Sequence, residues 1–183
     1  MKVAIGRRTL RSATAEVTIP GLIDGVERLF RAYHGLVFRA AYRITGNVTD
    51  AEDVLQTVFL RLIGRDGSAP PVENSENYLR RAAINAALDV VRARRPAATA
   101  PLADPQPSRG ELDRSELRDC LRRSLASLNP QAAEIFALRF FEGHSNPEIA
   151  RLLGVSQVRV AVTVHRARRQ LQKEIRSYIG GKS

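Results

Sequence analysis

The stretch GHSNPEIARLLGVSQVRVAVTVHRARRQLQ, Gly143 to Gln172, decides the fold of the second half of the chain, because it predicts two helices joined by a tight turn. Asn146 is expected to cap the first helix, since an asparagine oxygen accepts from an unpaired first-turn N–H, and Pro147 needs no donor there. Gly154 suits a left-handed C-terminal cap, and Ser156 can cap the second helix. Two such helices are typical of a helix-turn-helix, which places its second helix in the major groove of DNA.

The second of these helices is amphipathic. Apolar residues at steps of three and four form a stripe that is expected to be buried: Val160, Val164, Ala167, Leu171 and Ile175. The opposite face is basic: Arg166, Arg169, Lys173 and Arg176. One amphipathic basic helix is as compatible with an ordinary helical hairpin whose basic face is solvated. The expected caps and the Pro and Gly residues between them follow one another at the spacing of a helix-turn-helix, which favours the DNA-binding motif.

The composition indicates a globular protein with an anionic partner. The 183 residues are 44% hydrophobic, which is enough for helical cores, and the formal net charge is +10. A charge of this sign favours a polyanion. Because no apolar run is long enough to span a bilayer, nucleic acid is favoured over membrane insertion.

The residues that carry metal or redox chemistry are few. Cys120 is the single cysteine, which excludes a disulfide framework and a cysteine-based zinc site and fits a reducing cytoplasm. The histidines have no ligand spacing and are expected to be structural or surface residues. They are His34, His144 and His165. The chain is therefore predicted to be cytoplasmic, with no metal, cofactor or small-molecule substrate.

The first half predicts three helices. Helical spacing runs from Leu22 to Ile44, with a break allowed at Gly35. Thr49 and Glu52 form a candidate capping box for a second helix that ends before Gly64. The turn-rich stretch from residue 64 to 75 is expected to be an exposed loop.

A third helix is predicted from Ser75 to a stop imposed by Pro96. Its last turn carries Arg92, Arg94 and Arg95. These cations complement the helix dipole, and they could equally bind phosphate.

Residues 96–110 contain four prolines and no helical or strand period, so they predict a linker between two domains. About fifteen residues in an extended proline-rich conformation could separate the domains by roughly 45 Å. The expected fold is all-α, with two small helical domains, the second ending in the helix-turn-helix. We expect a disordered basic leader at 1–20, a first domain at 21–95, a Pro/Ala-rich linker at 96–114 and a second domain at 115–179.

Three segments in this order resemble the extracytoplasmic-function (group IV) sigma factors of bacterial RNA polymerase, in the sigma-70 superfamily. DAEDVLQTVFLRL at residues 50–62 is similar to the family's acidic polymerase-binding helix, and NYLRRAAINAALDVVRARR at 77–95 to its promoter-melting helix. The segment from Leu128 to Leu171 resembles the domain that reads the minus-35 element. The resemblance covers residues 22–179.

The resemblance implies three sets of contact residues. The polymerase set is Asp50, Glu52, Asp53 and Gln56, of which the acidic members could also be explained by the helix dipole alone. The set at the minus-10 element is Asn85, Asp89, Arg92 and Arg94. The set at the minus-35 element is Gln157, Val158, Arg159, Val162, Thr163, Arg166 and Arg169. The implied partners are the core polymerase, promoter DNA and an anti-sigma factor.

Two departures from the family pattern affect these expectations. Thr57 stands where the acidic helix usually has glutamate, so one polymerase contact is lost. The base-facing turn at residues 158–163 carries valines and a threonine where the family commonly has cations. Valine offers apolar contact, as to a thymine methyl, whereas arginine would read guanine. The sequence therefore predicts an upstream element with few guanine contacts and a shallow salt dependence.

Two other classes of function remain to be weighed. A stand-alone helix-turn-helix regulator would act without polymerase, but then the likeness of residues 50–56 to a polymerase-binding helix has no explanation. An enzyme acting on nucleic acid is disfavoured, because the sequence has no phosphate-binding glycine loop and no nucleophile with a plausible base. The expected function is promoter recognition and melting for transcription initiation, without catalysis by this chain.

Overall fold

The computed structural model describes residues 19–64, 74–94 and 109–180, and within these ranges every regular element is a helix. The all-α fold expected from the sequence is confirmed. Three expectations fall largely or wholly outside the described residues: the leader up to residue 18, the linker up to residue 108, and the loop between residues 65 and 73.

The first half is a three-helix unit. Helices α1 (Ile19–Thr45), α2 (Val48–Ile63) and α3 (Ser75–Ala93) all pack against one another. Helix α1 passes through Gly35 without the break that the sequence allowed, since Val37, Ala40 and Ala41 beyond the glycine are almost completely buried. Burial along one face holds the helix together, although glycine has a poor helix propensity.

The start of α2 differs from the prediction. Its cap is Asn47, whose side chain accepts from the Asp50 backbone N–H at 3.1 Å, so a capping box at Thr49 and Glu52 was wrong. Gly46 has a φ of 59°, a left-handed conformation that ends α1 and that suits glycine. Because only Gly46 and Asn47 separate the two helices, the chain turns before Thr49 is reached.

The second half is a four-helix unit. It consists of α4 (Arg109–Ser127), α5 (Pro130–Phe140), α6 (Asn146–Leu153) and α7 (Gln157–Gly180), and α7 contacts the other three. Asn129 caps α5 by accepting from the Ala132 N–H at 2.8 Å. Helix α4 already begins at Arg109, inside the range that the sequence assigned to the linker, 96–114.

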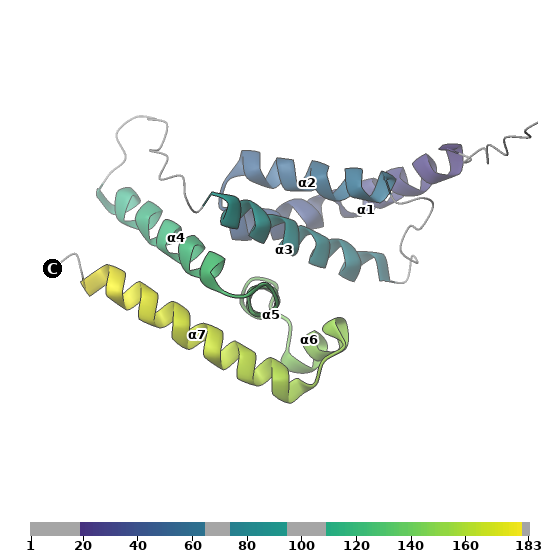
Figure 1. The fold of residues 1–183 in the computed structure, drawn as a ribbon. Coiled ribbons are helices and arrows are strands. Elements are labelled where there is room, and N and C mark those ends of the chain that lie inside the picture. Colours follow the sequence, from purple (N-terminus) through teal and green to yellow (C-terminus); the bar gives the residue numbers. More distant parts are fainter. Residues whose placement is uncertain (1–18, 65–73, 95–108, 181–183) are drawn as a thin grey trace, which may run out of the picture.

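The two units lie against each other. Helices α1, α2 and α3 form one layer, and α4 and α7 lie in a second, with α5 seen end-on between α3 and α7 (Figure 1). Helix α3 packs against both α4 and α5. The buried apolar side chains of both units belong to one contiguous core. The domain separation that a long linker would permit is therefore not the arrangement in this structure.

Candidate functional site

The helix-turn-helix is formed by α6, the turn at residues 154–156 and the start of α7. Ser145, rather than Asn146, caps α6: its hydroxyl accepts from the Glu148 N–H at 3.4 Å, and the Glu148 carboxylate accepts from the Ser145 N–H at 2.7 Å. This reciprocal pair is a capping box. Gly154 has a φ of 64°, as expected for a left-handed cap, and Ser156 caps α7 by accepting from the Arg159 N–H at 3.2 Å.

The capping box makes the stability of this motif sensitive to acid. Hydrogen bonds from the Ser145 side chain and backbone lower the pKa of Glu148 from its ordinary value of 4.5. A carboxylate with a lowered folded-state pKa adds stability that is fully present above about pH 4.5 and is lost as the pH falls through its folded value.

We expect Glu148→Gln to remove this contribution, because glutamine can keep a hydrogen bond but does not titrate. The measurement is the difference in thermal unfolding midpoint between the wild type and the variant, followed from neutral pH into acid. The difference should shrink as the pH falls below about 4.5. A difference that stays constant with pH would show that the ionised carboxylate adds nothing.

The first turns of α7 expose an apolar pair. Val158 is 73% exposed and Val162, one helical turn later, is 43% exposed. Gln157 and Arg159 are also exposed, and Thr163 is half-buried. The Arg159 guanidinium donates to the Gln131 side chain on α5 at 2.7 Å, which draws its charge towards α5. The surface that the helix presents at this end is therefore largely uncharged.

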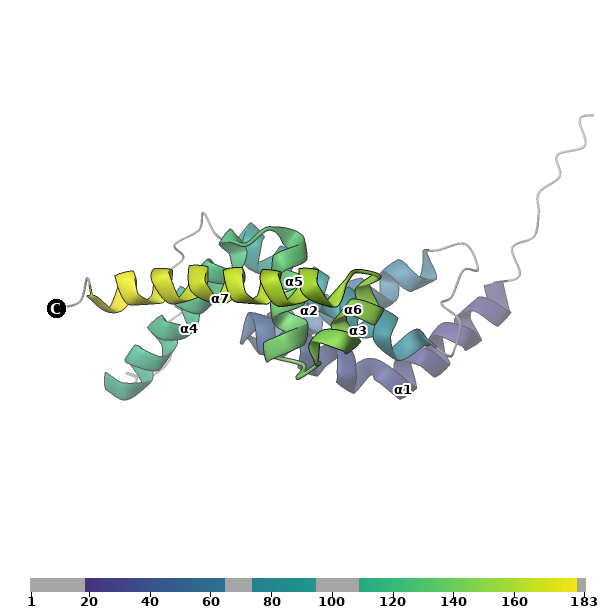
Figure 2. The same cartoon turned by 90° about the horizontal axis from the view of Figure 1, so that it is seen from below.

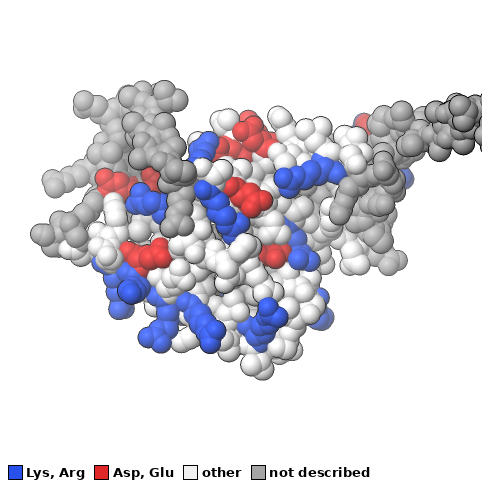
Figure 3. Space-filling model, viewed as in Figure 1, with Lys and Arg blue, Asp and Glu red and all other residues white. Residues whose placement is uncertain are grey.

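The rest of α7 has the two faces that the sequence predicts. Val160, Ala167 and Leu171 are buried, with Val164 and Ile175 half-buried beside them. The basic face is exposed: Arg166, Arg169, Lys173 and Arg176. Blue side chains gather along the edge of the molecule where α7 runs (Figure 3), and the view from below shows that α7 lies across the near face with α6 beside its first turns (Figure 2). This edge is a candidate surface for a polyanion.

The predicted polymerase set is divided by the structure. Glu52, Asp53 and Gln56 are exposed on one face of α2, but Asp50 is 4% exposed and its carboxylate accepts a hydrogen bond from Arg94 at the end of α3. Asp50 joins α2 to α3, as a buried carboxylate needs a partner. Leu60, which the sequence reasoning did not single out, is 65% exposed and follows Gln56 by one turn. Its spacing of four residues from Gln56 could have indicated from the sequence that the two side chains share one face of α2.

The predicted minus-10 residues all lie on α3 or its C-terminal cap, and each has an intramolecular partner. Arg92 donates to Asp89 at 3.1 Å, and Arg94 donates to Asp50. The Asn85 amide donates to Glu134 at 3.3 Å. Glu134 belongs to α5, so this contact joins the two units of the fold.

Among the described residues, no group of three or more histidine, cysteine or acidic side chains is placed to hold a metal ion. Cys120 is buried as a free thiol. None of the helices in the described part of the chain is long and apolar enough to cross a membrane.

Comparisons with known proteins match both halves of the chain. Residues 29–96 match the model of Sigma-70 region 2, and residues 118–171 match that of Sigma-70, region 4. The RNA polymerase sigma-E factor of Streptomyces avermitilis is 33% identical over 156 residues, which cover 82% of this chain and 85% of that protein. The ECF RNA polymerase sigma factor SigE of Mycolicibacterium smegmatis is 36% identical over 155 residues, which cover 80% of this chain and 60% of SigE.

A solved structure shows a similar fold. It is the structure of CnrH in complex with the cytosolic domain of CnrY, and the matched chain is 21% identical, with a TM-score of 0.52. The match covers 87% of this chain and 92% of the other.

Proposed function

Because this chain belongs to the extracytoplasmic-function sigma factors of the sigma-70 superfamily, we propose that it binds core RNA polymerase through α2 and reads promoter DNA through α3 and α7. The observation that carries the proposal is the presence, in one chain, of an exposed acidic face on α2 and an exposed basic face on α7. The first suits a cationic protein surface, and the second suits DNA. The chain positions and melts the promoter and has no catalytic role.

The polymerase contact is formed by Glu52, Asp53 and Gln56, extended by Leu60. These side chains are exposed at steps of three and four residues, so they lie on one face of α2. An acidic surface with an apolar end fits a basic helical partner with an apolar patch, since opposite charges steer and orient the encounter while the exposed Leu60 adds apolar contact when the partner covers it. Asp50 is not part of this contact, because its carboxylate accepts a hydrogen bond from Arg94 within the fold.

The minus-10 contact is formed by the α3 residues Asn85, Asp89 and Arg92, with Arg94 at its end. Cations at a helix C-terminus can hold phosphates, and an asparagine amide can pair with a base edge. Extruding a base costs a few kcal/mol of lost stacking, which such contacts must offset. DNA must displace the present partners of these side chains.

The minus-35 contact is formed by the start of α7. Arg166 and Arg169 hold phosphates, and Gln157, Arg159 and Thr163 surround the bases. The exposed pair Val158 and Val162 meets thymine methyl groups, because valine has no hydrogen-bonding group with which to read guanine. An anti-sigma factor is a further proposed partner, and it rests on the family resemblance of the sequence.

The experiment that tests the function is run-off transcription from a library of AT-rich promoters. The purified chain is added to bacterial core polymerase, and each component is left out in turn. Initiation at defined sites only when both are present is the expected result, and the recovered promoters give the preferred elements. Specific DNA binding by the chain alone, with no initiation when core is present, would instead indicate a stand-alone regulator.

We expect deoxyuridine in place of thymidine within the minus-35 element to weaken holoenzyme binding by about fourfold for each methyl lost, since burying one such group is worth about 0.8 kcal/mol. Deoxyuridine removes only the methyl group. The measurement is the dissociation constant for duplexes with the change in the element or in the spacer. With Val158→Ala and Val162→Ala together, the loss caused by deoxyuridine should largely vanish. An equal loss in the wild type and the double variant would rule out valine-to-methyl contact.

A further inference from the structure

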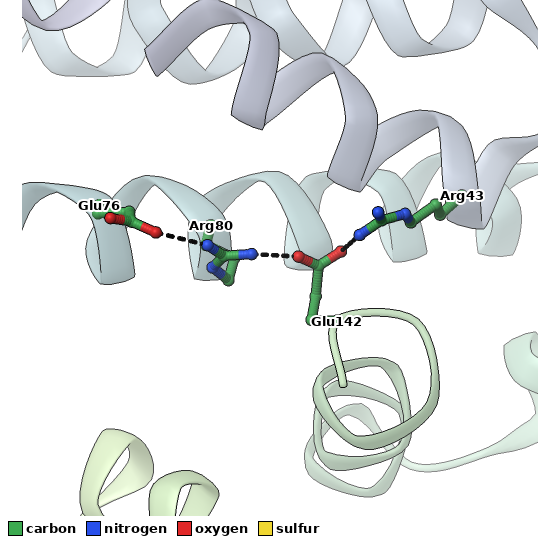
Figure 4. Close-up of polar contacts among 4 residues, drawn as sticks. All are labelled: Arg43, Glu76, Arg80 and Glu142. Atoms are coloured by element: carbon green, nitrogen blue, oxygen red, sulfur yellow. Dashed lines mark hydrogen bonds and ion pairs between the residues drawn. The ribbon is translucent and has the colours of Figure 1, made fainter. Parts of the chain in front are cut away.

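A buried carboxylate just after the end of α5 ties the two units together. The Glu142 side chain is 2% exposed, and each of its oxygens accepts from an arginine of the first unit. Arg43 of α1 donates to one oxygen at 2.9 Å, and Arg80 of α3 donates to the other. Figure 4 shows these side chains in a row that ends at Glu76, which pairs with Arg80 at 2.6 Å within α3.

A second carboxylate makes a parallel contact further along α3. The Glu134 side chain on α5 is 11% exposed and accepts from Arg81 at 2.8 Å and from Asn85 at 3.3 Å. Arg81 also donates to the backbone carbonyl of Leu152 in α6, at 3.2 Å. The second unit therefore contacts the face of α3 that carries Arg80, Arg81 and Asn85, of which Arg80 and Arg81 are half-buried and Asn85 stays exposed beside its bond to Glu134.

The contact between the two units is mixed, because apolar side chains of both units share one core and charged side chains also pair across it. Interfaces between domains of one chain resemble transient protein complexes, in which relative motion is expected unless the contact is large and hydrophobic. Here two acidic side chains of one unit meet three arginines of the other. A hollow of about 580 Å³ also remains between the start of α3 and α6, lined by residues that include Tyr78, Arg81 and Arg151. Once parted, all five charges would be solvated.

We propose that Glu134 and Glu142 form a latch that holds the free sigma factor closed and that must open before α3 reads the minus-10 element. The inference rests on the proposed function, since it regulates the site assigned to Asn85. In the closed state the Asn85 amide donates a hydrogen bond to Glu134. Arg80 and Arg81 each form an ion pair with a carboxylate of the second unit. DNA phosphates can replace these carboxylates, as both are anionic acceptors for arginine. Closure and DNA binding therefore compete for the same donors.

The test combines Glu134→Gln with Glu142→Gln in the full chain and measures its radius of gyration by small-angle X-ray scattering. Glutamine keeps the size of the side chain but not the charge that attracts the arginines. We expect the double variant to be more expanded than the wild type. Glu76→Gln is the matched control, because it removes a carboxylate from the same Arg80 without crossing between the units, and it should scatter like the wild type.

A second readout is the affinity of the free chain for single-stranded minus-10 DNA taken from the recovered promoters. The apparent dissociation constant is the intrinsic one divided by the open fraction. If about one wild-type molecule in ten is open, full opening tightens binding about tenfold. The reciprocal pair Arg43→Gln with Arg81→Gln should expand the chain in the same way, and circular dichroism checks that every variant keeps its helix content.

The outcomes separate the latch from the function on which it rests. Unchanged scattering in both double variants, together with unchanged DNA affinity in Glu134→Gln with Glu142→Gln and intact helix content, would overturn the latch even if transcription proceeds. Expansion of the double variants while neither they nor the wild type initiate with core polymerase would support the latch and overturn the proposed promoter function. Expansion with tighter DNA binding supports both.

Discussion

Replacing Ile149 with alanine is expected to lower the free energy of unfolding by about 2–5 kcal/mol, the usual range for such a change in a packed core. Helix α6 has eight residues, of which Ile149 and Ala150 are buried, and Ile149 is 0% exposed. So short a helix has no stability of its own and depends on packing. Since many domains are stable by only about 5–15 kcal/mol, the change threatens the whole motif.

The expected consequence for function is loss of minus-35 binding, because α6 supports the turn that positions α7. Ile179→Ala is the matched control: the residue type is the same, but the side chain is 57% exposed near the end of α7. Its effect should stay within about 0.5 kcal/mol. Chemical denaturation followed by circular dichroism gives both values. Similar losses for the two variants would mean that α6 is not held by Ile149.

The positions of helices were largely predictable from the sequence, as were the caps at Gly154 and Ser156, whereas the N-caps of α2 and α6 were shifted by one or two residues. Ser145 and Asn146 are adjacent and both are good capping residues, so composition cannot choose between them. The choice is made by the backbone, in which Ser145 is extended with a φ of −73° and a ψ of 159°. At α2 the same ambiguity between Asn47 and Thr49 was decided by the left-handed Gly46 just before the helix.

The contacts between the two halves could not be predicted from local pattern. Glu142 meets partners 62 and 99 residues away in the chain, and helical periodicity carries no information at such separations. The same limit applies to Asp50. It was assigned to the surface with its acidic neighbours, yet the fold brings Arg94 against it. Leu117 and Phe140 are apolar and yet remain 45% and 46% exposed.

Reversing two charges on α2 is expected to abolish recruitment by the polymerase. In Glu52→Lys with Asp53→Lys, the cations would face the basic surface that the family resemblance implies. Like charges brought together at an interface cost several kcal/mol, and about 1.4 kcal/mol is a factor of ten in affinity. We therefore expect core binding to weaken by about a hundredfold or more, measured by titrating labelled core polymerase with the variant.

A control variant must show whether core binding is lost because of the change in net charge or because of the position of the reversed charges. Glu27→Lys with Asp119→Lys makes the same change in net charge at two side chains that are each 52% exposed and lie on α1 and α4. This control should bind core nearly as well as the wild type, apart from a weak, salt-screened effect. Both double variants should keep their DNA-binding surfaces, since neither change touches α3 or α7. If the control loses core binding to the same extent, overall charge rather than the α2 face determines recruitment, and the acidic residues of α2 are then explained by the helix dipole alone.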